Sequence, residues 1–124
     1  MSSAAVTAIR QIAINVKDPA RATAFYRDVI GLPFLFAAGT LAFFDCGGVR
    51  LMLTTAEKPE FDHPSSIIYF TVADLRAAFE RMKAAGASFV DEPHLVARMP
   101  DHELWMCVFH DTEGNMQALM SEVR

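Results

Sequence analysis

The side chains that could bind a metal or act in catalysis are spread through this 124-residue chain. Gln11 lies in an apolar, β-rich segment, where its amide oxygen could serve as a neutral metal ligand. The imidazole donors are far apart in sequence: His63, His94, His102 and His110. Each histidine taken alone is more typical of a surface or hydrogen-bonding residue than of a ligand. A metal site formed by Gln11, His63 and His102 or Glu103 stays open as an alternative.

Other catalytic patterns are missing from the sequence. His102 and Glu103 are neighbours on a predicted strand, so regular alternation sends at most one of them toward a shared pocket. No Ser-His-Asp order, glycine-rich phosphate loop or pair of carboxylates at a suitable spacing is present. Cys46 and Cys107 form no CxxC motif, and we expect them to be reduced structural thiols.

The segments that must position these residues occur twice. Residues 9–18 and 65–74 are both β-rich runs that end in Val-x-Asp, and each precedes an alanine-rich helical pattern that stops at a glycine, Gly31 or Gly86. Short strand-like runs with glycine-containing turns follow in both copies. The chain is therefore an internal duplication of the order strand, helix and three strands, which can build two curved half-barrels around a pocket.

The element boundaries follow from caps and periodicity. Asp18 and Asp74 are natural N-caps, so we expect helices over 19–30 and 75–85. A polar, proline-containing stretch, 55–64, has no periodicity and is the expected linker, and 92–101 is a second irregular stretch. The remaining apolar runs predict strands at about 33–37, 41–45, 49–54, 88–91, 103–110 and 116–121.

Two motifs give the chain a resemblance to a known family. Val16-Lys17-Asp18 leads into a helix whose end reads Ala24-Phe25-Tyr26-Arg27-Asp28-Val29-Ile30-Gly31-Leu32, and the last hairpin carries Asp111-Thr112-Glu113-Gly114-Asn115-Met116-Gln117-Ala118-Leu119. In these motifs the chain resembles the vicinal oxygen chelate superfamily, which includes glyoxalase I, bleomycin-resistance proteins and extradiol dioxygenases. The resemblance implies an α+β fold in which two tandem βαβββ modules form curved mixed sheets around a cavity. It also implies a single domain over 1–124, with modules 6–56 and 65–122 and the linker 55–64.

In metal-dependent members, the resemblance implies four inward-facing ligands, one from the first and one from the last strand of each module. Gln11 occupies the first of these positions, and Met52 stands at the second. In the second module the positions hold Ile67, or Ser66 if the register slips by one, and Ala118. Thioether, alkyl and methyl groups cannot replace carboxylates or histidines around a hard or borderline ion. We therefore expect the usual metal site to be absent and no cofactor to be required.

The strand alternation that holds Met52 and Ala118 on the cavity face turns Leu51, Leu53 and Leu119 toward the helices. Flexible, polarizable methionines suit the binding of apolar or aromatic molecules, although they could equally fill the core. Tyr69 and Trp105 could stack on a ligand or anchor the core, and Arg50 could either orient an anionic group or be solvated. The candidate ligand-binding residues are Gln11, Arg50, Met52, Tyr69, His102, Glu103, Trp105, Met116, Ala118 and Met120.

Composition restricts the partners. A net charge of −4 with 11 basic residues argues against binding to nucleic acid or to an anionic membrane, and no apolar stretch is long enough to span a bilayer. We expect a cytoplasmic homodimer that binds a small molecule. The favoured function is metal-independent binding of an apolar or aromatic molecule. The alternatives are a divergent metal-dependent lyase, isomerase or dioxygenase with rearranged ligands and, third, a structural interaction module.

Overall fold

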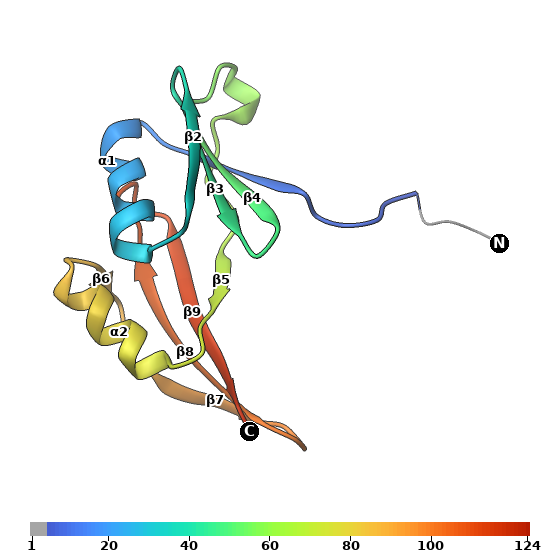
Figure 1. Ribbon diagram of the computed structural model, residues 1–124, viewed down its shortest axis with the longest axis vertical. Helices are drawn as coiled ribbons and strands as arrows, with labels where there is room; N and C mark the ends of the chain where they lie inside the picture. Colours follow the sequence, from blue (N-terminus) through green and yellow to red (C-terminus); the bar gives the residue numbers. More distant parts are fainter. Residues whose placement is uncertain (1–4) are drawn as a thin grey trace.

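The computed structural model describes residues 5–124, which follow the order strand, helix and three strands in each half of the chain (Figure 1). The first half contains β1 (Gln11–Asn15), α1 (Pro19–Ala24), the π-helix η1 (Phe25–Ile30), β2 (Phe34–Ala38), β3 (Leu41–Cys46) and β4 (Val49–Thr54). A short 3-10 helix, η2 (Pro59–Phe61), follows in the linker. The second half contains β5 (Ile68–Thr71), α2 (Leu75–Ala84), β6 (Ser88–Phe89), β7 (His94–Arg98), β8 (Glu103–His110) and β9 (Met116–Val123).

Each half forms its own mixed sheet. The strand order in the first sheet is β1-β4-β3-β2, and in the second it is β5-β9-β8-β6, with β7 also paired to β8. In both sheets the first strand of the module runs parallel to the last, β1 beside β4 and β5 beside β9, and the β3–β4, β7–β8 and β8–β9 pairs are antiparallel. The predicted α+β architecture of two curved mixed sheets is confirmed.

One hydrophobic core joins the two modules. Figure 1 shows α1 and α2 on the same side of the sheets, and the buried cluster beneath them takes side chains from both halves. The rings of Phe25 and Phe109, one from each module, have centroids 6.4 Å apart. Leu51, Leu53 and Leu119 are buried in this cluster, as their strand alternation predicts. The opposite face of each sheet points away from the helices, and we call it the open face.

The first helix differs from its prediction in its second half. Asp18 caps α1 through its side chain, which accepts a hydrogen bond from the Arg21 N–H. After Ala24 the chain continues as η1, and the backbone N–H groups of Gly31 and Leu32 both donate to the Tyr26 carbonyl. Apolar spacing alone does not distinguish this wider hydrogen-bonding pattern from a continuous α-helix.

Two further segments differ from their predictions. The stretch 92–101, expected to be irregular, contains β7, which pairs in antiparallel register with β8. Its strand conformation depends on hydrogen bonds to a segment that follows it, so local composition does not reveal it. The linker is also partly ordered, because it contains η2. No helix in the described part of the chain is long and apolar enough to cross a membrane.

The two family motifs meet in a buried polar network between the modules. The Tyr26 hydroxyl donates to Asp111 Oδ2 at 2.6 Å and accepts from Gln117 Nε2 at 2.7 Å. Asp111 also accepts hydrogen bonds from the backbone N–H groups of Glu113 and Asn115. Burial, reinforced by the charge of Asp111, raises the pKa of Tyr26 far above its ordinary value. Through Tyr26, Asp111 and Gln117, the two motifs therefore hydrogen-bond the first module to the second.

The second module also caps both ends of the first module's helical segment. The Glu113 carboxylate accepts hydrogen bonds from the backbone N–H groups of Lys17 (2.8 Å) and Asp18 (3.1 Å), just before α1 begins. At the far end, Arg81 Nη2 of α2 donates to the carbonyls of Val29 (2.9 Å) and Ile30 (3.1 Å). Arg81 thus satisfies orphan carbonyls at the end of the helical segment, and together the four hydrogen bonds link the two modules at both ends of it.

Candidate functional site

The open face of the first sheet carries a row of apolar side chains across its strands. In the strand register Ala13 lies beside Met52, Met52 beside Phe43, and Phe43 beside Phe36. The rings of Phe36 and Phe43 stack with centroids 4.4 Å apart. Phe36 is 48% exposed, so the row ends in an accessible aromatic surface. Sequence reasoning found Met52 but missed both phenylalanines, although the alternation of β3 offered a signal for Phe43.

The linker covers part of this row and forms one wall of an open cavity of about 450 Å³. Met52, Ala13 and Leu41 line it from the sheet, and Phe61 and His63 line it from the linker. This volume lies within the roughly 300–1,000 Å³ typical of small-molecule pockets. The cavity is thus built by the first module, the linker and the first two residues of the second module, Ser65 and Ser66, with an apolar floor and several polar groups in its walls.

Asn15 holds the linker in place over the cavity. Its side-chain Nδ2 donates to the carbonyls of Phe61 and His63, the latter at 2.9 Å. Its backbone N–H donates to Ser65 Oγ at 3.3 Å. Sequence reasoning missed Asn15 and Phe61, because the linker has no periodicity and the bonds that fix it join residues far apart in sequence.

A polar row lies beside the apolar row. Arg50 Nε donates to Gln11 Oε1 at 2.7 Å, and Gln11 Nε2 lies 3.7 Å from the Met52 sulfur. The Arg50 guanidinium carbon is 5.6 Å from the centroid of the Phe43 ring, within cation–π range. The structure therefore brings together three of the predicted site residues, Gln11, Arg50 and Met52.

The side chains at the four family positions do not fit a divalent metal. The Gln11 oxygen already accepts from the Arg50 cation, whose charge would repel a metal ion beside it. Met52 and Ala118 offer no oxygen or nitrogen donor, and alternation back from β5 places Ile67, rather than Ser66, at the remaining position. Residues 5–124 also contain no group of three or more His, Cys, Asp or Glu side chains that could hold a metal, so a single chain does not gather His63, His102 and Glu103.

On the second sheet, the other predicted residues lie on the corresponding open face. Tyr69 pairs with Ala118, and Met120 pairs with Met106, in register with the neighbouring strands. Tyr69 is 53% exposed and Met116 is 42% exposed, whereas Ala118 is buried. None of these residues is among those that line the 450 Å³ cavity.

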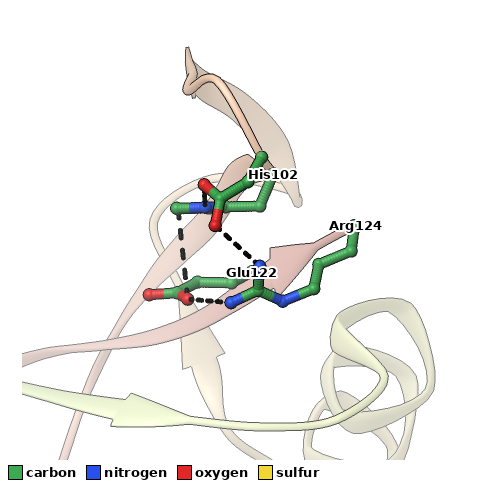
Figure 2. A network of polar contacts seen from close by, with 4 residues as sticks. His102, Glu122 and Arg124 are labelled. Carbon is green, nitrogen blue, oxygen red and sulfur yellow. Dashed lines mark hydrogen bonds and ion pairs between the residues drawn. The ribbon is translucent and has the colours of Figure 1, made fainter.

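The remaining candidates lie around the hairpin of β7 and β8. Figure 2 shows His102 beside Glu122 and Arg124; His102 Nδ1 is 2.8 Å from Asp101 Oδ1, and His102 Nε2 is 4.0 Å from Glu122 Oε1. Arg124 completes this surface network through a 2.8 Å contact with Asp101. These charged partners give His102 a structural explanation that requires no ligand.

Glu103 makes a separate set of contacts. It accepts hydrogen bonds from Trp105 Nε1 and from Arg98 Nε, both at 3.1 Å, and these bonds lower the pKa of its carboxyl, with Trp105 the larger cause. Trp105 is partly buried against the shared core. His102, which precedes β8, and Glu103, the first residue of β8, therefore have different partners.

The comparison with protein families agrees with this architecture. The model of the Glyoxalase/Bleomycin resistance protein/Dioxygenase superfamily matches residues 8–119. The chain belongs to this superfamily. Among curated proteins, metallothiol transferase FosB of Staphylococcus haemolyticus is 31% identical over 72 residues, which are 56% of this chain and 52% of that protein. The chain thus spans about half the length of the curated relatives it matches.

Solved structures of other proteins share the fold over almost the whole chain. A protein from the mobile metagenome of V. Pseudocholerae has a TM-score of 0.78 at 17% identity, covering 97% of this chain and 98% of the other. Lactoylglutathione lyase from Agrobacterium tumefaciens has a TM-score of 0.69 at 23% identity, covering 94% of each chain. At these identities the likeness shows the fold alone.

Proposed function

We propose that this superfamily member binds a small apolar or aromatic molecule in the cavity beneath the linker, without the divalent metal that the family usually holds. The observation that carries the proposal is the position of Met52. It stands where a metal ligand would be expected, yet it lines a 450 Å³ cavity together with Ala13, Leu41 and Phe61. A thioether there offers polarizable contacts to an apolar ligand and no donor for a hard cation.

The energetics favour a ligand that makes both apolar and polar contacts. Burial of about 200 Å² of apolar ligand surface contributes roughly 5 kcal/mol before the cost of association is subtracted. Apolar contact alone would give weak and unselective binding. Asn15 lines the cavity from β1, and Gln11 and Arg50, beside Met52 on the open face, add an amide and a charged group next to it.

We further propose that two copies of the chain associate through their open faces. Ile67, Tyr69 and Met116 leave 50%, 53% and 42% of their surfaces exposed on or next to β5 and β9. The segment before β1 extends away from both modules, and it carries Val6 and Ile9, which are largely exposed (Figure 1). A second copy would cover these apolar groups and would bring Tyr69, Met116 and Met120 against a partner's cavity.

The functional test is a pair of methionine substitutions. A thermal-shift screen of aromatic and metabolite compounds, run with EDTA present, identifies ligands, and calorimetry then measures their affinities. Met52→Lys places a charge in the cavity and should abolish binding. Met99→Lys, at a 48% exposed position that does not line the cavity, should leave binding unchanged.

Two outcomes would overturn the proposal. The first is the absence of any stabilising compound from a broad screen. The second is unchanged affinity in a folded Met52→Lys variant. If Met52→Lys unfolds the protein instead, Met52→Gln offers a milder polar change at the same site, and full affinity in that folded variant would also contradict the proposal.

A divergent metal-dependent enzyme is the second candidate. The observation that favours it is the partial similarity to FosB, whose name describes a metallothiol transferase. Such an enzyme would need ligands in another arrangement, since the four family positions do not supply them. Metal analysis separates the two candidates.

A further inference from the structure

The Arg50 guanidinium is held in place before any ligand arrives. Its Nε is fixed by Gln11 Oε1 at 2.7 Å, and its planar group lies 5.6 Å from the centroid of the Phe43 ring. Gln11 is in turn in contact with the Met52 sulfur, 3.7 Å away. An arginine anchored through Nε keeps both Nη atoms, which can donate two parallel hydrogen bonds.

The charge around Arg50 is not neutralised by an ion pair. Among the described residues, no carboxylate oxygen lies within ion-pair distance of its guanidinium. Arg10, Arg21 and Arg81 share this property, whereas Arg27, Arg76, Arg98 and Arg124 have such partners. The acidic residue opposite Arg50 in the strand register is Asp45, and one of its oxygens accepts a hydrogen bond from the Gly48 N–H. What distinguishes Arg50 is that it is anchored on the open face beside Met52 with both Nη atoms available, so it can pair with an external anion.

We propose that the ligand is an aromatic or apolar carboxylate, whose carboxylate pairs with Arg50 while its ring or hydrocarbon body lies against Met52. This inference rests on the proposed binding function and specifies its ligand class. Arg50 and Met52 are two residues apart on one strand and point to the same face, so their Cα atoms are separated by about 7 Å. A planar carboxylate matches the two Nη donors better than a point-like group does.

The test compares two probes with the same ring and nearly the same shape, the anionic 2-naphthoate and the neutral 2-naphthamide. Calorimetry in low-salt buffer with EDTA should show that the wild type binds the carboxylate about tenfold more tightly than the amide, because a hydrogen-bonded ion pair is lost in the amide. Arg50→Met should remove this preference while leaving the affinity for naphthamide unchanged. Arg27→Met, which removes an arginine already paired with Asp28, should retain it.

Further variants keep the test decisive. Arg50→Lys, which retains the charge without the planar fork, should give an intermediate preference, and it replaces Arg50→Met if the latter does not fold. Gln11→Leu, which frees the guanidinium, should reduce the preference without abolishing it. Equal binding of the two probes by the wild type, or an undiminished preference in a folded Arg50→Met or Arg50→Lys variant, would overturn the inference.

The outcomes also separate this inference from the binding function beneath it. If naphthamide binds in a manner that depends on Met52 but the carboxylate brings no gain, the cavity function stands and the ligand class is wrong. If the wild type binds neither probe, the ligand class is wrong, and the wider screen decides the cavity function by itself.

Discussion

Removal of the Tyr26 hydroxyl should show how strongly the two modules are fastened together. Tyr26→Phe keeps the buried ring but deletes two hydrogen bonds, one donated to Asp111 and one accepted from Gln117. A hydrogen bond to a charged group is worth roughly 1.5–3 kcal/mol, and a buried donor left unpaired costs a further 1–3 kcal/mol. Gln117 is 1% exposed and its Oε1 already has no partner, so water cannot readily replace the lost acceptor. We expect a loss of about 3 kcal/mol in the free energy of unfolding.

Urea denaturation followed by circular dichroism measures this loss. Tyr69→Phe is the matched control, because Tyr69 is 53% exposed, and it should change the free energy of unfolding by less than about 0.5 kcal/mol. Gln117→Leu should lower the free energy of unfolding less in the Tyr26→Phe background than in the wild type, with a coupling energy of roughly 1 kcal/mol. The reason is that the leucine removes the Gln117 N–H donor that Tyr26→Phe leaves without an acceptor. A Tyr26→Phe variant as stable as the wild type, or additive effects of the two substitutions, would refute this account of the network.

Three further predictions concern pH, metal content and assembly. Burial, with a smaller effect of the Asp91 charge, raises the pKa of Cys107 to about 11, so the folded state keeps a proton that the unfolded chain releases above about pH 8.5. The free energy of unfolding should therefore fall by up to about 1.4 kcal/mol per pH unit between pH 9 and 10. Cys107→Ala should flatten this slope in urea titrations. Protein purified without chelator should hold less than about one-tenth of an equivalent of Zn, Ni, Fe or Mn by elemental analysis, and EDTA should leave its melting temperature unchanged. Stoichiometric metal in the wild type that is absent from Gln11→Ala, His63→Ala or His102→Ala would favour the metal-dependent candidate. Sedimentation at micromolar concentration should show a dimer that Tyr69→Glu weakens, and a strict monomer would exclude the proposed association.

The sequence predicted the parts of the fold that depend on local chemistry. Asp18 and Asp74 cap their helices as expected, because an N-cap is formed by residues only three positions apart. Leu51 and Leu53 are buried while Met52 faces the cavity, because strand alternation is a property of the backbone itself. Both features could be read without knowledge of any partner strand.

The features that escaped prediction all depend on contacts between distant residues. β7 is a strand through its pairing with β8, and the linker covers the cavity through hydrogen bonds from Asn15. The hydrogen bond between Tyr26 and Asp111 joins residues 85 positions apart. The motifs in which they lie indicated the family, but not that their side chains would meet. Of the residues predicted to bind a ligand, Met52 lines the cavity, whereas Asn15 and Phe61, which complete its walls, were not predicted.

The most direct test of the central claim is a methyl NMR titration of protein labelled with ¹³C at the methionine methyl groups, with EDTA present throughout. The chain has seven methionines, so the spectrum can be assigned by single substitutions. Addition of a ligand from the screen should shift the Met52 resonance, while Met82, which is buried in the core, and Met99, on the surface, should stay in place. An unchanged Met52 resonance at saturating ligand, or binding that disappears with EDTA, would contradict metal-independent binding in the cavity beneath the linker.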